Sequence, residues 1–213
     1  MTPTHLGRPF GASGEQTRQR IITATMRCVA KRGYSRATIR EIARMANVTS
    51  ASLYNYFPNK SELLKATIAA RTDVAMPRLR QAAAGAGDVV DRIEAVLDEC
   101  GHLMRDYPDL AAFEWAIRAE NVITLDGREA TGGNGAETEP GFSTFHEIIA
   151  GLVDDACQHG ELGDHQDPRG AVEAIYALIY GLTELAATLP PDAYQSTLNS
   201  AKVLVKGTLF GRA

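Results

Sequence analysis

Residues 37–57 read ATIREIARMANVTSASLYNYF, and the order of residue types in this stretch decides the fold. Thr38 is followed three residues later by Glu41, which is the spacing of a capping box at the start of a helix. Thr49 stands at the cap position of a second helix. The stretch therefore predicts two short helices, over residues 38–45 and from residue 49 to residue 56 or 57.

Residues 46–48 join the two helices and are expected to form a tight turn. Asn47 is expected to adopt a positive φ there, a conformation that asparagine tolerates better than most residues. A shared apolar seam, with small residues where the helices approach each other, fits two helices packed together. The seam consists of Ile39, Ile42, Ala43, Ala46, Val48 and Leu53. The pattern predicts a helix-turn-helix, a motif whose second helix enters the major groove of DNA.

Burial of this seam leaves the opposite side of the second helix facing outward. Hydroxyl groups there can bond to base edges or phosphates, Ala51 can contact a thymine methyl, and Asn55 can pair with adenine. Thr38, Arg40 and Lys60 are placed to contact phosphates. The second helix contributes the candidates Thr49, Ser50, Ala51, Ser52, Tyr54 and Asn55. A generic helical hairpin with a polar exterior is the alternative interpretation.

The distribution of charge separates the N-terminal quarter from the rest of the chain. Residues 1–60 contain ten Lys and Arg against two acids, a net charge of +8. The remaining 153 residues contain twelve against twenty-four, a net charge of −12, and the two values sum to the −4 of the whole chain. A basic module on an acidic remainder is typical of a protein that contacts nucleic acid through one part only. We therefore predict a DNA-binding domain over residues 1–60 and a second domain over residues 61–213.

Residues 38–43 (TIREIA), 46–60 (ANVTSASLYNYFPNK) and 62–64 (ELL) resemble the DNA-binding signature of the TetR family of bacterial repressors. The chain departs from the family pattern where it has Asn47 or Ala51 in place of Gly. It also has Tyr56 where the family usually has His. The resemblance implies backbone contacts by Tyr54, Tyr56 and Lys60, and base reading by Ser50, Ala51 and Asn55.

Helical periodicity continues through nearly the whole chain, without sustained alternation of apolar and polar residues. We therefore predict an all-α fold of about nine helices, with a three-helix N-terminal domain that contains the helix-turn-helix. Pro77 is expected to bend or break its helix. Residues 126–141 are glycine-rich and are expected to form a mobile loop. The other helices are expected over about residues 15–32, 59–80, 88–105, 109–121, 142–159, 167–189 and 192–210.

The resemblance implies that the C-terminal helices hold a ligand pocket and that the last two helices form a homodimer. Both of these helices have stripes of small and apolar residues that can pack against a symmetry mate. Packing within one chain is the alternative for each residue. The stripes are Ala171, Ala174, Leu178, Gly181, Leu182 and Leu185 on one helix, and Leu198, Ala201, Val205 and Leu209 on the other.

Polar or aromatic residues within apolar helices are the candidates for an effector pocket. A cavity with a few converging polar groups suits a small organic ligand. Arg118 can receive a carboxylate, which makes an acidic effector conceivable. Each candidate can instead be an ordinary core or surface residue. The candidates are His102, Trp115, Arg118, Phe145, His146, Tyr176 and Tyr180.

The sequence offers no arrangement typical of an enzyme or a cofactor site. His146 and Glu147 begin a pattern like His-Glu-x-x-His, but Ala150 stands where the second histidine is needed. The glycines within residues 132–135 follow no strand and precede no phosphate-binding lysine. The scattered histidines and the three cysteines lack the ligand spacing of a zinc site. We expect no catalysis, no cofactor and no metal.

No apolar run reaches the roughly 18 residues needed to span a bilayer. The N-terminus also lacks an apolar segment long enough for a signal peptide. The three cysteines lie at wide spacings in helical patterns and are expected to be reduced, buried thiols. We therefore expect a cytoplasmic protein without membrane contact.

The helix-turn-helix and the charge distribution predict DNA binding, and the resemblance implies a dimeric transcriptional repressor that binds a palindromic stretch of double-stranded DNA. A small organic effector would favour a dimer whose two recognition helices no longer match successive major grooves. The alternative is a DNA-binding architectural or partner-regulated protein whose C-terminal domain only dimerises.

Overall fold

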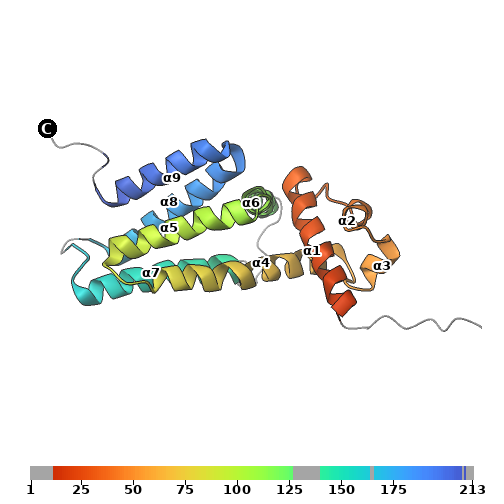
Figure 1. Ribbon diagram of the computed structural model, residues 1–213, viewed down its shortest axis with the longest axis horizontal. Coiled ribbons are helices and arrows are strands. Elements are labelled where there is room, and N and C mark those ends of the chain that lie inside the picture. The colour runs from red at the N-terminus through yellow and green to blue at the C-terminus, as the bar shows by residue number, and fades with distance from the viewer. Residues whose placement is uncertain (1–11, 127–139, 164–165, 208, 210–213) are drawn as a thin grey trace, which may run out of the picture.

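The computed structural model describes residues 12–126, 140–163, 166–207 and 209. These residues form nine α-helices and no β-strand, as the sequence predicts. Figure 1 shows α1 to α3 at one end of an elongated molecule and the other helices extending away from them. The helices are α1 (Ala12–Arg32), α2 (Ile39–Met45), α3 (Ser50–Tyr54), α4 (Lys60–Ala83), α5 (Val89–Asp106), α6 (Leu110–Asp126), α7 (Pro140–His159), α8 (Pro168–Thr188) and α9 (Pro191–Val205).

The N-terminal end of the molecule has its own apolar core. Ile21 of α1, Ile42 of α2 and Leu53 of α3 are fully buried in it. Leu63 and Ile68, in the first turns of α4, also belong to this core. The same core also takes Phe113, Ala116 and Ile117 from α6, which packs on α1. The three N-terminal helices are therefore seated on α4 and α6.

The helix starts of this region follow from local capping. The Thr38 side chain accepts a hydrogen bond from the Glu41 amide, and the Glu41 carboxylate accepts from the Thr38 amide, which confirms the capping box. The turn after α2 places Asn47 at φ 55°, as predicted, and the Val48 amide donates to the Ala43 carbonyl at 2.9 Å. Thr49 caps α3 by accepting from the Ser52 amide at 3.0 Å. These contacts complete the helix-turn-helix.

Helix α3 is shorter than predicted, because it ends at Tyr54 instead of Tyr56 or Phe57. The Asn55 amide donates to Ser52 and the Tyr56 amide to Leu53, both over three residues. Such bonds tighten the end of a helix into a turn. Pro58 favours extended backbone at the residue before it, which prevents the helix from continuing.

Helix α4 begins at the predicted cap, where Asn59 accepts from the Glu62 amide at 2.9 Å. It continues past the predicted end and through Pro77 to Ala83, so the expected break is absent. Met76 and Leu79 lie on either side of Pro77 and are buried in the core. Packing on both sides of the proline keeps the two halves of α4 in one helix.

The second core lies among α4, α5, α7, α8 and α9, which run alongside one another in Figure 1. Leu97 of α5 and Ile149 of α7 are completely buried at its centre. Leu182, Leu198 and Ala201 of the proposed dimer stripes are also buried here, so these three residues pack within the chain. Because α4 and α6 contribute to the N-terminal core as well, the domain boundary at residues 60 and 61 stays a prediction.

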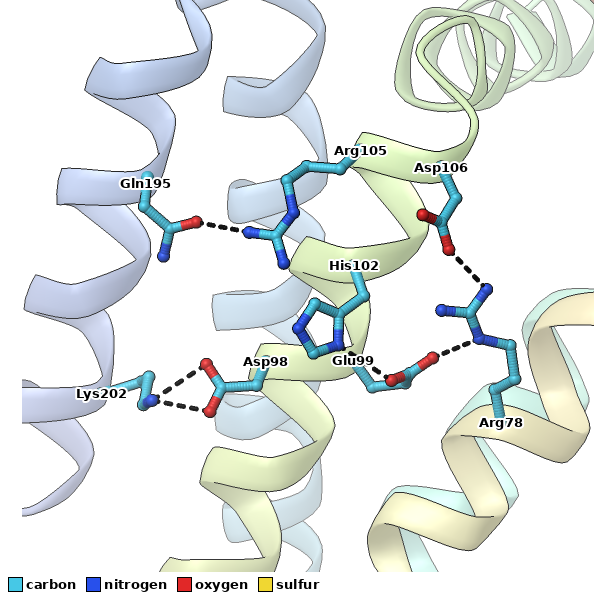
Figure 2. A network of polar contacts seen from close by, with 8 residues as sticks. All are labelled: Arg78, Asp98, Glu99, His102, Arg105, Asp106, Gln195 and Lys202. Atoms are coloured by element: carbon cyan, nitrogen blue, oxygen red, sulfur yellow. Dashed lines mark hydrogen bonds and ion pairs between the residues drawn. The ribbon is translucent and has the colours of Figure 1, made fainter.

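Polar contacts connect α5 to helices on both sides of it (Figure 2). Arg78 of α4 forms ion pairs with Glu99 and with Asp106, the latter at 2.9 Å. On the other side, Lys202 of α9 contacts Asp98 at 2.7 Å. These contacts hold α4, α5 and α9 in register along the outside of the core.

Two helix ends differ from the predictions. Helix α6 continues to Asp126 instead of Asn121, because the first helix breaker in the sequence is Gly127. Helix α9 ends at Val205 instead of Phe210, and Gly207 follows with φ 71°, the left-handed conformation that commonly ends helices. Of the glycine-rich loop predicted over residues 126–141, residues 127–139 lie outside the described part of the chain.

Two of the three cysteines are buried as expected, Cys28 and Cys100, but Cys157 is exposed on α7. Burial raises the pKa of the Cys100 thiol to about 12. Among the described residues, α8 is the one helix long and apolar enough to cross a membrane by length and composition alone. A bundle helix passes the same test, and α8 packs against α6, α7 and α9.

Candidate DNA-binding surface and effector cavity

Helix α3 has one buried side and one exposed, polar side. Its Leu53 side chain is completely buried, which fixes the rotation of the helix. As a result Ala51, Tyr54 and Asn55 are exposed, and 51% of the Tyr54 surface is accessible. Ser50 and Ser52 are half-buried beside them. The structure thus brings the predicted base-reading residues of α3 together on one outward face.

The two predicted threonines both serve as helix caps. The Thr38 hydroxyl donates to the Glu41 carboxylate at 3.0 Å, while Thr49 accepts from Ser52. The hydrogen bond from the Thr38 side chain is the main reason that the pKa of Glu41 is lowered. Both threonines are exposed, and so is Arg40 on α2. The threonines therefore fix the geometry of the surface in addition to any contact that they make with DNA.

Lys60 has a structural role that the sequence interpretation missed. Its ammonium group donates to the Tyr34 and Ser35 carbonyls and lies 4.1 Å from the centre of the Tyr34 ring. Lys60 thereby fastens the start of α4 to the loop between α1 and α2. Tyr56 is half-buried and packs against the N-terminal core. Phosphate contacts by Lys60 and Tyr56 stay predictions.

Arg36 and Arg44 are further candidates for phosphate contacts. Arg36 lies in the loop before α2 and Arg44 in its last turn, and both are exposed. The charge count of the N-terminal quarter includes both residues, but their individual positions carry no motif that would single them out. Exposure in the folded chain is what distinguishes them.

A cavity of about 80 Å³ lies among the helices of the bundle. Four predicted pocket residues line it, Arg118 on α6, Phe145 on α7, and Tyr176 and Tyr180 on α8. The Phe145 and Tyr176 rings lie 6.3 Å apart. Burial raises the pKa of the Tyr176 phenol, so it stays protonated at neutral pH and can donate a hydrogen bond. Most of the remaining lining is apolar.

The cavity also contains a buried ionic cluster, of which the sequence interpretation found only one member. Arg71 of α4 forms an ion pair with Glu114 of α6, and Glu114 also lies 4.0 Å from Arg118. The Arg71 and Glu114 side chains are only 10% and 7% exposed. The Arg118 guanidinium stacks on the Tyr180 ring at 4.2 Å. The four-residue spacing of Glu114 and Arg118 was a usable signal, but nothing in the sequence pairs Arg71 with Glu114.

Three predicted pocket residues lie away from this cavity. His102 is on the outer side of α5, where it contacts Glu99 at 3.2 Å (Figure 2). Trp115 is 53% exposed, because it projects from α6 opposite the buried side of that helix. His146 contacts Glu173 at 3.0 Å outside the cavity lining. The rotation of each helix about its own axis places these side chains outside the cavity. A single polar residue in an apolar segment does not define this rotation.

Comparison with known protein families matches residues 21–67 to "Bacterial regulatory proteins, tetR family". The transcriptional regulator SrpR of Pseudomonas putida is 42% identical over 66 residues, which are 31% of this chain and 31% of SrpR. The transcriptional repressor KstR of Mycolicibacterium smegmatis is 28% identical over 93 residues, 44% of this chain and 46% of KstR. These alignments span less than half the length of either relative.

Solved structures resemble nearly the whole chain. The fatty acid degradation regulator FadR from Bacillus halodurans has a TM-score of 0.72 at 17% identity, over 92% of this chain and 97% of that one. FadR from Bacillus subtilis, solved in complex with stearoyl-CoA, has a TM-score of 0.69 at 19% identity, over 90% and 99%. At these identities the likeness shows that the fold is shared.

Proposed function

We propose that the chain is a regulator of the TetR family, a sequence-specific, DNA-binding transcriptional repressor released by a small-molecule effector. The observation that carries this proposal is the exposed face of α3, held by the buried Leu53 and the Thr49 cap. The curated relatives that match this region are named as transcriptional regulators or repressors. A role on DNA also agrees with the expected cytoplasmic location.

In this proposal the residues of α3 and of its two caps divide into two groups. Ser50, Ala51 and Asn55 read bases, while Tyr54 and the cations around α2 contact phosphates. Thr49 and Ser52 lie at the helix start, where backbone amides also favour phosphate oxygens. The exposure of Ala51, Tyr54 and Asn55 supports this division.

DNA binding is tested by selecting duplexes from a random library with the full chain, then measuring affinity for the selected sequence by fluorescence anisotropy. We expect a palindromic sequence and an affinity that falls roughly a hundredfold or more between 50 and 200 mM salt. The affinity falls because binding releases cations from the DNA, and this release is less favourable at higher salt. A salt-independent affinity would exclude the proposed interface.

Variants separate base reading from phosphate contact. Asn55→Ala should weaken binding by about 1–3 kcal/mol and relax the preference at one base pair. Arg40→Ala should weaken binding to all sequences alike and reduce the salt dependence. Arg169→Ala, an exposed arginine at the start of α8, is the matched control and should bind as the wild type does. Lys60 is unsuitable for this test because it supports the loop after α1.

The homodimer through α8 and α9 is part of the same proposal. Ala174 and Leu185 of α8 are exposed, as are Val203 and Leu204 of α9, although the opposite sides of both helices are buried. Burial of such apolar surface favours association. Light scattering should give twice the chain mass for the wild type, and Leu204→Glu should give the mass of one chain. A single-chain mass for the wild type would contradict the dimer.

The cavity favours a ligand-controlled repressor over the alternative of a ligand-independent architectural protein. A filled core would have supported the alternative, whereas this core contains space beside buried charges. FadR of Bacillus subtilis, which shares the fold, was solved with stearoyl-CoA bound. A thermal-shift screen of metabolites, followed by displacement of the selected DNA, tests this part. Stabilising compounds that leave DNA binding unchanged would support the alternative.

A further inference from the structure

A second cavity, the junction cavity, lies where the N-terminal helices meet the bundle. It has a volume of about 170 Å³, against about 80 Å³ for the candidate effector cavity. Arg71 and Ala75 line both cavities, which are therefore neighbours. The other apolar residues that line the junction cavity are Ile22 and Met26 of α1, Ala70 and Val74 of α4, Leu103 of α5 and Leu110 of α6.

The lining of the junction cavity combines buried apolar residues with exposed polar ones. Ile22 and Leu103 are only 2% and 3% exposed. Gln19, Thr23 and Tyr107 also line the cavity and are exposed, so they mark its mouth. The Thr23 hydroxyl donates to the Gln19 carbonyl at 3.0 Å and can still accept a hydrogen bond. An apolar interior with a few polar groups is the usual composition of a small-molecule site.

The charges of the lining favour an uncharged ligand. Arg71 is the one formally charged side chain among the described residues that line the junction cavity. It forms an ion pair with the Glu114 carboxylate, so its charge already has a counter-ion within the chain. An ion that entered the apolar interior would lose its hydration without a partner to replace it. The cavity therefore suits a neutral molecule.

The volume and the lining of the junction cavity suit one aromatic ring. An apolar cavity of about 150 Å³ is large enough to bind benzene. Met26 is half-buried in the lining, and a thioether sulfur contacts aromatic rings favourably. The Tyr107 ring at the mouth can pair with a second ring. Both side chains favour an aromatic ring over a saturated ring of similar size.

We propose that the junction cavity is a ligand site for an uncharged molecule with a single aromatic ring and one small polar substituent. The ring occupies the apolar interior beside Met26. The substituent lies at the mouth, where Thr23 and Tyr107 provide hydroxyl groups. The site is additional to the candidate effector cavity, and the inference does not depend on the proposed function.

A ligand in the junction cavity contacts both ends of the molecule at once. Helix α1 belongs to the N-terminal core, whereas Leu103 belongs to the core of the bundle. An ion pair already connects these ends, between Arg27 of α1 and Asp109 at 3.1 Å. Arg27 directly follows Met26, and Asp109 directly precedes Leu110. A bound ring adds apolar contacts beside this ion pair and so holds α1 more firmly on the bundle.

Calorimetry and thermal shift with the wild-type chain test the ligand class. Phenol is compared with cyclohexanol, and benzyl alcohol is compared with benzoate and benzylammonium. Phenol and benzyl alcohol should bind saturably and raise the denaturation temperature. Benzyl alcohol should bind at least about tenfold more tightly than either ion, because the ions lose their hydration. Phenol should bind roughly two- to tenfold more tightly than cyclohexanol, because its ring contacts the Met26 sulfur.

Methionine methyl groups locate the ligand in the wild-type chain. Met26 lines the junction cavity alone, whereas Met76 and Met104 line the candidate effector cavity alone. In NMR spectra of the isotope-labelled methyl groups, phenol should shift the Met26 signal most, because the ring lies closest to it. Replacement of each methionine by leucine assigns the signals. A larger shift at Met76 or Met104 would place phenol in the other cavity and overturn the inference.

A variant that fills the junction cavity gives an independent test. Ala70→Leu should weaken phenol binding at least about tenfold, because the larger side chain occupies the space of the ring. Ala69→Leu is the matched control, since Ala69 precedes it on α4 but is exposed and outside the lining. It should bind phenol as the wild type does. The NMR comparison uses the wild-type chain, so it stands even if Ala70→Leu fails to fold.

Non-saturable binding of phenol, equal affinities within either comparison, or a folded Ala70→Leu variant with unchanged phenol affinity would each overturn the inference. All of these measurements are made without DNA. A chain that binds its selected DNA but not phenol would therefore refute this inference alone. A chain that binds phenol beside Met26 but has no specific affinity for DNA would support the inference and refute the proposed function.

Discussion

Buried polar groups at the two ends of the molecule have different kinds of partner. In the N-terminal core, Thr25 and Thr67 are buried, and each hydroxyl donates at 2.8 Å to a carbonyl one turn earlier in its own helix. At the candidate effector cavity, the buried Glu114 forms ion pairs with arginines of two helices. Polar groups are thus satisfied locally at one end and between helices at the other.

This difference separates a region with one stable arrangement from a region that can be rearranged. A threonine bonded to its own helix gives no ligand an opportunity to compete. An ion pair between two helices can be replaced by another ion with the same charge, and the helices then lose a connection. The contrast agrees with a rigid surface for reading DNA and an adjustable cavity for sensing a ligand.

Thiol labelling gives the largest expected effect, because it compares both cores in one experiment. Cys28 lies in the N-terminal core and Cys100 in the bundle, while Cys157 is exposed. Burial raises the pKa of both buried thiols, so reaction requires opening of the core. We expect Cys157 to react roughly a thousandfold faster than either. Mass spectrometry measures the rates, and faster labelling of Cys28 than of Cys100 would contradict a rigid N-terminal core.

Truncation of one buried leucine in each core gives the next largest effect. Leu53 and Leu97 are both completely buried, so Leu53→Ala and Leu97→Ala should each cost about 2–5 kcal/mol of unfolding free energy. Leu53→Ala should also weaken DNA binding more strongly, because Leu53 supports the exposed face of α3. Urea denaturation and anisotropy measure the two quantities. Equal losses of DNA affinity would mean that the two ends do not act as separate regions.

The turn of the helix-turn-helix predicts a smaller effect. Asn47 has φ 55°, a conformation that costs L-residues other than glycine about 1–2 kcal/mol. Asn47→Gly should therefore keep or raise the thermal denaturation temperature, whereas Asn47→Ala should lower it. The two variants control each other, since both remove the amide group. A lower temperature for Asn47→Gly would show that the asparagine side chain, and not its backbone conformation, matters.

The capping box predicts the smallest effect, and it depends on pH. The Thr38 hydrogen bond lowers the pKa of Glu41, so the stabilisation is present above the unfolded-state pKa and is lost as the pH falls through the folded-state pKa. Glu41→Gln can still accept the capping bond but does not titrate. Between about pH 5 and about pH 3, the wild type should lose more stability than Glu41→Gln. Parallel pH curves from thermal denaturation would disprove this assignment.

The sequence predicted the helix-turn-helix in detail because its determinants are close together in the chain. The capping box, the positive φ of Asn47 and the Thr49 cap each depend on residues within one or two turns. The structure ends α3 earlier than the sequence predicts, because the last turn tightens before the chain reaches Pro58. Interactions between residues close together in the chain thus determine that α3 forms, whereas the position of its last residue depends on finer details of the backbone geometry.

The lining of the candidate effector cavity is predicted only in part, because the residues that form it lie far apart in the chain. Arg118, Phe145, Tyr176 and Tyr180 were found from their unusual polarity or size. His102 has the same sequence signal but lies on the outer side of α5. The rotation of each helix in the bundle decides between the two outcomes, and that rotation depends on residues of other helices.

Helix α4 runs from Lys60 to Ala83 without a loop and contributes to both cores. This continuity sets a rule for building sensors from interchangeable parts. A foreign ligand-binding bundle must be joined to α1 to α3 in helical phase, because each inserted or deleted residue in α4 rotates the bundle by about 100° relative to these helices. Junctions that preserve the register of Leu63 and Ile68 with Met76 and Leu79 should yield responsive chimaeras, whereas junctions shifted by one residue should not.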